Sequence, residues 1–303
     1  MASDIESAEK EATQETTPVP ATAAASATPA ATAPAHTTSA RDAWYPAGKR
    51  DLFILRELVS KDFKLKYRRS VLGVIWSVLN PLLMMLVMSL VFSFFLRYDN
   101  IEHYPLYLIV ANITWQVFAD STNAGMMSII DAAPLLKKVR VKKSVFPVEK
   151  VLFSLVNFLF SLIAVFVVML WEGVPPTPMM LLAPVCIVLL MLFCVGLSLL
   201  LSALAVFFRD LVHLWSVLLM AWMYATPLFW PVSMIEQVPY HIVRVLMYVN
   251  PMYNYVTFMR DTVIYSTLPP TEVIVSCVVW ALVSLALGLL VFRSRERRFI
   301  LFI

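Results

Sequence analysis

The chain has 303 residues, of which 60% are hydrophobic and 15% charged, and it carries a formal net charge of +4. A single soluble core could not bury so many apolar side chains, so the composition excludes an ordinary soluble domain and indicates a protein that crosses a membrane several times. The six glycines lie no closer than 23 residues apart, which excludes both common glycine-rich phosphate loops and thus the usual ways to bind a nucleotide.

Residues 1–48 form a segment of different composition. Its first 40 residues are rich in Ala, Thr, Pro and Ser and carry five acidic side chains against one lysine, Lys10. Such a segment has almost nothing to bury, so we predict a disordered, acidic cytoplasmic tail. It lacks a basic start followed by an apolar stretch, and no cleaved signal peptide is predicted.

An amphipathic helix is predicted over residues 49–70, lying in the cytoplasmic membrane interface. Apolar residues recur there with a helical period and charged residues occupy the opposite face; the two sets are Leu52, Leu55, Val59 and Phe63, and Arg50, Glu57, Lys61, Lys64 and Arg68. Just before the first span, a cationic collar is formed by Lys64, Lys66, Arg68 and Arg69. The collar either binds anionic membrane lipid or contacts a phosphate-bearing substrate headgroup, and the pattern leaves both possibilities open.

Residues 71–303 are predicted to form an all-α polytopic membrane domain. Six stretches are long and apolar enough to cross a hydrocarbon core of about 30 Å, at residues 71–96, 106–130, 148–171, 179–208, 211–230 and 273–292. In the connections after spans one, three and five the only Lys or Arg residues are Arg97, Arg244 and Arg260, so the positive-inside rule places both termini in the cytoplasm. Pro81 interrupts the first span, and the carbonyl that it frees must be satisfied inside the protein.

The second span carries three polar side chains four residues apart, Asn112, Gln116 and Asp120. Polar groups at membrane depth normally face the protein interior or a water-filled path, so this stripe is a candidate channel lining. Asp120 could also relay protons, but no second carboxylate or lysine lies mid-span to pair with it. A structural or lumen-lining role is therefore favoured.

The connection after the second span is strongly basic, with five cations in residues 137–143. Part of this charge is a topogenic signal. Asp131 is expected to cap a short helix over residues 132–139, and Pro147 to mark the start of the next span. A basic helix perpendicular to the spans suits docking on a soluble partner, although topology and lipid contact alone also explain its charge.

Small residues line one face of the fourth span, where Cys194, Ser198 and Ser202 repeat beside Gly196. Such a stripe lets a neighbouring helix approach closely, either within the chain or across a dimer. The three cysteines of the chain all fall within apolar runs and are expected to be small core residues. No metal site is predicted.

Residues 231–270 are expected on the outer side, yet they are rich in aromatic and apolar side chains. Asn250 and Pro251 are typical of an N-cap and a first helical residue, and a helix of about 15 residues starting there is too short to cross. We therefore predict two half-depth gate helices between spans five and six, which pack on protein or line a cavity. The candidate channel or gate residues in and before this segment are Tyr224, Phe229, Trp230, Asn250, Pro251, Tyr253, Tyr255 and Arg260. Their aromatic rings would anchor the membrane interface or stack on sugar rings.

Several stretches, taken in order, carry a family resemblance. After the basic interfacial helix come RRSVLGVIWSVLNPLL, LLKKVRVKKSVFPVEKVL, VFFRDLVHLWSVLL and TPLFWPVSM, followed by LMYVNPMYNYVTFMRD. Over residues 51–292 this order resembles the type-2 ABC (ABC-2) exporter permeases, specifically their polysaccharide and teichoic-acid branch.

The resemblance implies a homodimer of six-span subunits in the bacterial cytoplasmic membrane. A separate cytoplasmic ATPase would bind ATP and Mg, so this chain would be a transport subunit without a cofactor, an enzymatic activity or a nucleic-acid partner. The substrate would be a glycan built on a polyprenyl diphosphate lipid, such as O-antigen or teichoic acid, and the collar would contact its headgroup.

The resemblance also implies that the basic connection is a coupling helix, which would sit in a groove of the ATPase. The residues carried over are Asp131, Leu135, Leu136, Lys137 and Lys138 for this helix, and Arg209 and Asp210 for a second cytoplasmic contact. The chain departs from the family pattern by residues 140–144, which are inserted before Phe146 and Pro147.

Three other functions stay open on the sequence. The chain could be an ABC-2 permease for a drug or lipid, a proton-coupled carrier that uses Asp120, or a membrane scaffold that transports nothing. The aromatic outer segment and the interfacial helix favour glycan export over the first of these. The lack of a mid-span partner for Asp120 speaks against the second.

Overall fold

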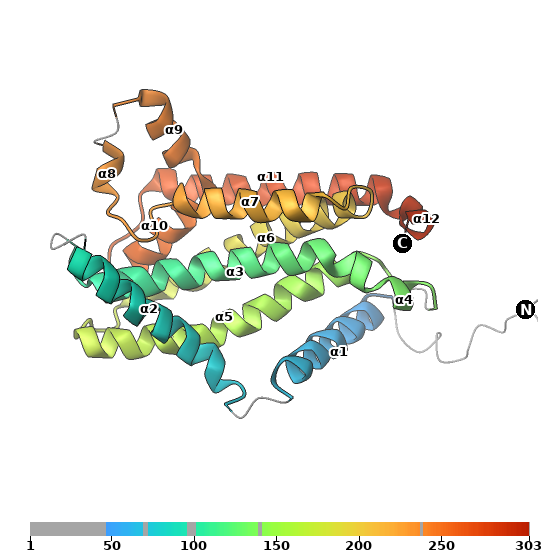
Figure 1. Cartoon of the computed structure of the whole chain (residues 1–303), viewed down its shortest axis with the longest axis horizontal. Coiled ribbons are helices and arrows are strands. Elements are labelled where there is room, and N and C mark those ends of the chain that lie inside the picture. The colour runs from blue at the N-terminus through green and yellow to red at the C-terminus, as the bar shows by residue number, and fades with distance from the viewer. Residues whose placement is uncertain (1–46, 69–71, 96–100, 139–140, 237–238, 303) are drawn as a thin grey trace, which may run out of the picture. The chain divides into compact units, whose positions relative to one another are not determined.

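The computed structural model describes residues 47–68, 72–95, 101–138, 141–236 and 239–302 (Figure 1). The predicted tail up to residue 46 lies outside these ranges, as do Arg69, Arg97 and Val139. Every regular element in the described ranges is helical, which confirms the all-α class. In chain order the elements are α1 (Ala47–Tyr67), α2 (Ile75–Phe95), α3 (Tyr104–Asp131), α4 (Ala133–Leu136), α5 (Val145–Glu172), the 3₁₀ helix η2 (Pro178–Leu182), α6 (Ala183–Ala205), α7 (Leu211–Tyr224), α8 (Ser233–Glu236), α9 (His241–Val249), α10 (Pro251–Val263), α11 (Thr271–Arg295), the 3₁₀ helix η3 (Glu296–Arg298) and α12 (Phe299–Phe302).

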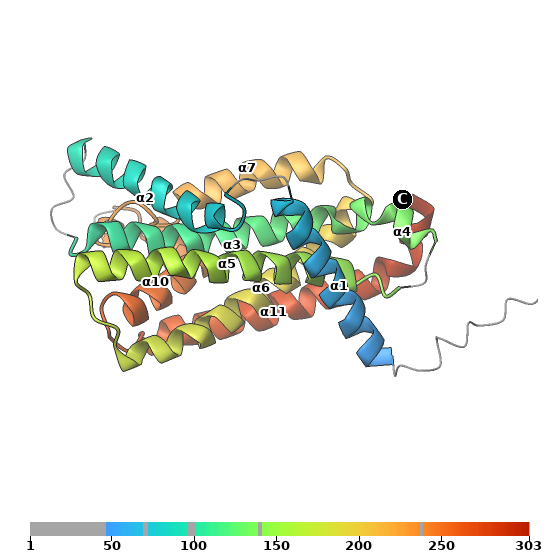
Figure 2. The same ribbon diagram turned by 90° about the horizontal axis from the view of Figure 1, so that it is seen from below.

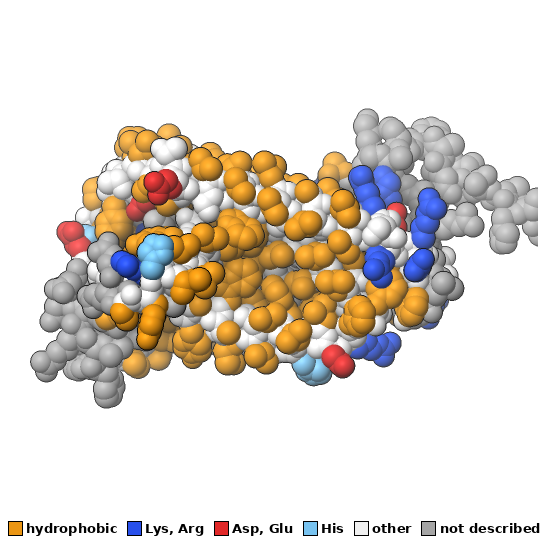
Figure 3. Space-filling model, turned by 90° about the horizontal axis from the view of Figure 1, so that it is seen from above, with side chains coloured by type: hydrophobic (Ala, Val, Ile, Leu, Met, Phe, Trp, Pro, Cys, Tyr) orange, Lys and Arg blue, Asp and Glu red, His pale blue; other side chains and the backbone are white. Residues whose placement is uncertain are grey.

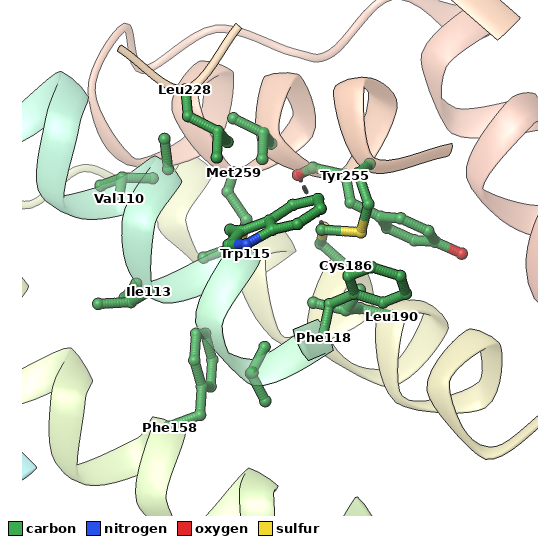
Figure 4. Close-up of a cluster of buried hydrophobic side chains, with 14 of the residues drawn as sticks. Val110, Ile113, Trp115, Phe118, Phe158, Cys186, Leu190, Leu228, Tyr255 and Met259 are labelled. Carbon is green, nitrogen blue, oxygen red and sulfur yellow. Dashed lines mark hydrogen bonds between the residues drawn. The ribbon is translucent and has the colours of Figure 1, made fainter. Parts of the chain in front are cut away.

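The core lies where α3, α5, α6, α10 and α11 pack together (Figures 1 and 2). The ring of Phe118 in α3 stacks on Phe193 of α6, with 5.7 Å between the centroids. Tyr255 of α10 is buried beside them and donates a hydrogen bond of 2.8 Å to the Cys277 carbonyl of α11; Figure 4 shows its place in the cluster. Large buried rings contribute strongly to core stability, so these contacts bind together helices that are far apart in the sequence.

Within the described residues, three helical segments are long and apolar enough to cross a membrane: α5, α6 with the preceding η2, and α11 with the following η3. Two further apolar helices are shorter, Ile75–Val91 within α2 and the whole of α7. On the face shown in Figure 3, apolar side chains cover the middle, and most of the Lys and Arg side chains gather at the end that holds α4 and α12. This distribution is typical of a helical protein that crosses a membrane several times.

The fifth predicted span, over residues 211–230, is wrong in extent. α7 ends at Tyr224 after 14 residues, a length of about 21 Å. Pro227 accounts for the break, because proline has no N–H for a helical hydrogen bond and disfavours helix in the residue before it. Residues 225–230 continue as irregular backbone.

Pro81 of α2 is accommodated as the sequence requires. The Ser77 carbonyl, which would otherwise accept a hydrogen bond from residue 81, accepts one of 3.2 Å from the Ser161 hydroxyl of α5. α2 therefore continues through Pro81 from Ile75 to Phe95, and a neighbouring helix satisfies the carbonyl that the proline frees.

The helices α6 and α11 are in direct backbone contact. A Cβ added at Gly196 or at Gly288 would overlap main-chain atoms of the other helix. Two residues further along and on the opposite side of α6, the Ser198 hydroxyl donates a hydrogen bond of 3.0 Å to the Ser121 carbonyl of α3. The small residues of α6 thus pack within the chain, but on two faces: Gly196 against α11 and Ser198 against α3. The three cysteines are free and buried, in agreement with their predicted role.

Candidate functional site

The predicted coupling segment begins where α3 ends and is a single turn of helix. α4 spans only Ala133–Leu136, so the predicted helix over residues 132–139 is too long. The predicted capping by Asp131 is also wrong. Asp131 is the last residue of α3 and is itself helical, and Ala132 takes the N-cap position of α4 without a side-chain hydrogen bond.

This turn exposes most of the predicted docking set and leaves Leu136 half-buried. The exposed members are Asp131, Leu135, Lys137 and Lys138. No ion pair with a described residue holds the two lysines. Leu136, also predicted to dock, instead packs inward against a cluster that joins the ends of α3, α5, α6 and α11 and contains Ile129, Phe146, Leu199 and Phe292.

The turn between α6 and α7 lies at the same end of the molecule as α4 (Figure 1). Arg209 and Asp210 are both exposed there. The Asp210 carbonyl accepts hydrogen bonds of 3.1 Å from the amides of His213 and Leu214, which start α7. The structure thus leaves the two predicted contact side chains accessible to a partner.

α1 packs obliquely on α5 (Figure 2). Asp62 of α1 forms an ion pair with Lys150, and the Phe63 ring stacks on Phe160 with 5.7 Å between the centroids. Glu57, Lys61, Lys64 and Arg68 of the charged face are exposed as predicted, but Leu52 of the apolar stripe is also 69% exposed. At Phe63 the stripe packs on α5, which anchors α1 on the helical bundle.

The residues of the cationic collar differ in their contacts with the rest of the chain. Lys66 donates a hydrogen bond of 2.9 Å to Asn157 of α5 and lies 5.6 Å from the centre of the Phe153 ring. Lys64 and Arg68 are exposed and remain accessible to a ligand, while Arg69 lies outside the described residues.

The polar stripe of α3 lies partly on the surface of the single chain. Gln116 donates a hydrogen bond of 2.8 Å to Asp120, both residues are exposed, and Asn112 is half-buried. Asp120 forms no ion pair with a described residue. Gln116 and Asp120 thus form an exposed polar pair that is accessible to water or to a second subunit.

Asn250 is the N-cap of α10, as predicted. Its side-chain oxygen accepts the Met252 amide at 3.0 Å, and Pro251 is the first helical residue. The same oxygen accepts the Trp222 indole N–H at 2.7 Å, and the Asn250 amide donates to Thr226 at 3.0 Å, which ties α10 to the end of α7. With nine residues in α9 and 13 in α10, neither helix exceeds about 20 Å, too short to cross a membrane.

Arg260 of α10 is the most heavily engaged cation in the outer segment. Only 2% of it is exposed, and its guanidinium donates to the carbonyls of Pro227 at 2.8 Å and Leu228 at 3.0 Å. It also donates to the Tyr107 carbonyl at 3.4 Å and lies 3.3 Å from the centre of the Tyr107 ring. The arginine therefore satisfies the irregular backbone that follows α7 with several donors at once.

Two tyrosines at the start of α3 complete this arrangement and were not predicted. Tyr104 donates to the Phe229 carbonyl and Tyr107 to the Trp230 carbonyl, each at 2.9 Å. The sequence signal that could have indicated this role is the spacing of Tyr104 and Tyr107, three residues apart and next to a connection that is predicted to lie on the outer side. Together with Arg260 they hold residues 227–230 in place.

An outer cavity of about 470 Å³ opens beside Arg260. Its walls carry three tyrosines and two carboxylates, namely Tyr107, Tyr253, Tyr265, Glu102 and Asp261. The volume lies within the range of about 300–1,000 Å³ that is usual for small-molecule sites. Ring faces can pack on the C–H face of a sugar while carboxylates accept its hydroxyl hydrogens, so this lining suits a hydroxyl-rich ring.

The other predicted gate residues lie elsewhere. Tyr224 is exposed at the end of α7, and Phe229 and Trp230 are half-buried in the irregular stretch. Tyr255 lies in the core, away from the outer cavity. The structure thus brings Tyr253 and Arg260 together at the cavity.

Residues 55–264, from α1 to the end of α10, match the family described as ABC-2 type transporter. The O-antigen export system permease protein RfbA of Myxococcus xanthus is 35% identical over 247 residues, which cover 81% of this chain and 94% of that protein. A protein of the same name from Klebsiella pneumoniae is 30% identical over 250 residues, which cover 82% of this chain and 93% of that protein.

Proposed function

Because this chain belongs to the ABC-2 type transporter family, we propose that it is the membrane-spanning permease subunit of an ATP-driven polysaccharide exporter in the bacterial cytoplasmic membrane. The observation that carries this proposal is the similarity, over nearly their whole length, to relatives named as O-antigen export permeases. The substrate class is an O-antigen or a related surface glycan, built on a polyprenyl diphosphate lipid.

Energy for export comes from a separate cytoplasmic ATPase that holds ATP and Mg. Its groove receives α4 through the exposed Leu135, Lys137 and Lys138, and Arg209 with Asp210 forms a second contact. Leu136 packs on the cluster that joins α3, α5, α6 and α11. A displacement of α4 by the ATPase would therefore move four helices together, because a packed core transmits strain.

Two copies of the chain form the transporter, with both termini in the cytoplasm. Six crossings per copy are made by α2, α3, α5, η2–α6, α7 with the residues after it, and α11. The exposed Gln116 and Asp120 of α3 support this assembly, because pairing two copies around a water-filled path removes the carboxylate from lipid. α9 and α10 are half-depth gate helices, and Arg260 fixes the backbone against which they close.

The glycan contacts two places on the chain. Lys64 and Arg68 of the collar meet the diphosphate of the lipid carrier, since cationic side chains pair well with phosphate oxygens. The outer cavity, with its tyrosines and carboxylates, contacts sugar rings as they leave. An interfacial helix before the first span and a sugar-compatible outer cavity favour this substrate over a small drug.

A deletion experiment tests the function. Cells without this chain should lose surface polysaccharide and accumulate the lipid-linked glycan inside, and the wild-type chain should restore both.

Asp120→Asn should restore export to within about twofold, because a carboxamide keeps the hydrogen bond with Gln116 and an ATP-driven exporter needs no proton relay. Complete loss of export by an Asp120→Asn chain that assembles normally would instead favour a proton-coupled carrier.

Charge reversal of Lys137 and Lys138 to Glu should remove the ATPase. We expect at least a tenfold fall in ATPase co-purification, about 1.4 kcal/mol or more, because the docking surface changes from attraction to repulsion. Reversal of Lys61 and Lys64 in α1 alters the charge equally on another exposed surface and should leave co-purification unchanged. Full ATPase recovery with the Lys137 and Lys138 variant would contradict the assignment of α4.

A further inference from the structure

A second cavity, of about 950 Å³, lies at the end of the molecule that holds α4. Residues 141–144 form one wall, and residues from the last turns of α11 and from η3 form the other. We propose that this cavity binds the headgroup of an anionic phospholipid from the cytoplasmic leaflet, a ligand distinct from the exported glycan. The assignment of this cavity to the cytoplasmic leaflet rests on the proposed topology, in which both termini lie in the cytoplasm.

Positive charge predominates in this lipid cavity. Four cations line it against one carboxylate, Glu296; they are Lys142, Lys143, Arg293 and Arg297. Lys142 forms an ion pair with Asp51 of α1, whereas Arg293 and Arg297 form none with a described residue. The excess charge is thus unbalanced within the described chain, and guanidinium groups offer phosphate oxygens paired N–H donors.

Lys143 is held inside this positive environment. Its ammonium donates to the main-chain carbonyl of Glu296 and lies 5.6 Å from the centre of the Phe299 ring. Partial burial lowers the pKa of Lys143, and the nearby Glu296 carboxylate offsets this only in part. An anion bound in the cavity would stabilise the charged form of the lysine.

The apolar surface next to the cavity points to a lipid rather than a soluble anion. Leu289 and Phe292 form part of the wall. Just before Arg293, Leu287 and Leu290 are exposed on α11, Leu290 by 67%. Acyl chains can lie along this surface while the headgroup enters the cavity at the membrane interface, whereas a soluble anion would use only the cations.

The cavity also gives a role to the residues inserted after α4. Residues 141–144 belong to the stretch that is predicted from the sequence to be inserted relative to the family pattern. Lys142 ties this stretch to α1, and Lys143 ties it to the turn after α11. A lipid phosphate bound between Lys143 and Arg297 would hold the connection that follows α4, so lipid binding should stabilise the segment that meets the ATPase.

Native mass spectrometry of the purified permease and ATPase complex tests the lipid cavity, with phosphatidylglycerol and phosphatidylcholine as probes. Wild type should retain phosphatidylglycerol specifically. Arg293→Gln with Arg297→Gln should bind it about thirtyfold more weakly, because two cations near a membrane surface are lost and each contributes about 1 kcal/mol. Arg295→Gln with Arg298→Gln removes the same charge from neighbouring positions outside the cavity and should retain the lipid.

Two outcomes of these binding measurements would overturn the proposal. Equal weakening by both double variants would show that diffuse charge alone attracts the lipid. Stabilisation of the wild type by inorganic phosphate or diphosphate, without any by phosphatidylglycerol, would identify a soluble anion as the ligand.

If the Arg293 and Arg297 variant cannot be purified, crosslinking of photoactivatable phosphatidylglycerol to the wild-type chain tests the proposal instead. Crosslinks within residues 289–297 support the cavity, and their absence there overturns it. Lipid retention is measured without transport, so failure of the lipid proposal remains distinct from failure of the export function.

Discussion

Replacing Arg260 by alanine is expected to abolish export and to lower the Tm of the purified chain by roughly 10 °C. The guanidinium donates to three main-chain carbonyls, on Pro227, Leu228 and Tyr107, and covers the Tyr107 ring. Alanine removes these donors and with them the support of the buried carbonyls of Pro227 and Leu228, at a cost of about 3–5 kcal/mol. Surface polysaccharide measures export, and tryptophan fluorescence during heating in detergent measures the Tm.

The variant Arg260→Lys tests whether export and stability need only the positive charge at position 260 or also the geometry of the guanidinium. Arg260→Lys keeps the charge but cannot place several fixed donors on separate carbonyls while covering a ring, so it should fail as well. Arg56→Ala removes an exposed arginine of α1 and should change neither measurement. Wild-type export by Arg260→Ala would show that the irregular stretch needs no such support and would remove the gate assignment.

Alanine at Gly196 or Gly288 is expected to prevent stable folding. At either position the new Cβ overlaps main-chain atoms of the facing helix, and no side-chain rotation can relieve such an overlap. α6 and α11 must then separate along their shared surface, at a cost that we place above about 3 kcal/mol. The expected result is at least a tenfold lower yield of monodisperse protein, measured by size-exclusion chromatography at equal expression.

Two other glycines provide graded controls for this prediction. A Cβ at Gly125 would overlap the Ser198 side chain, so Gly125→Ala should be partly rescued by Ser198→Gly. Gly173 has a positive φ of 70° but open space around it, and Gly173→Ala should cost only about 1 kcal/mol. Normal yields for alanine at Gly196 and Gly288 would contradict the close approach of α6 and α11.

Local sequence patterns predicted the start of α10 but not the start of α4, where the predicted cap at Asp131 is wrong. The N-cap at Asn250 and the first-turn Pro251 follow from backbone chemistry within three residues, and both are present. The orientation of the coupling turn did not follow in the same way. Leu135 and Leu136 are equivalent in sequence, but only Leu136 reaches the cluster with Phe146 and Phe292, because that choice depends on where α5 and α11 end.

Composition and periodicity by themselves determined the helical class, the membrane location and the absence of the common phosphate loops. These properties depend on the apolar content of the chain and on spacing along it, which no folding step alters. Only the tertiary structure decided how the irregular backbone after α7 is held and what Arg260 does. Pro227 marks the break in the sequence, but the donors that satisfy the carbonyls of residues 227–230 come from α3 and α10, which are remote in sequence.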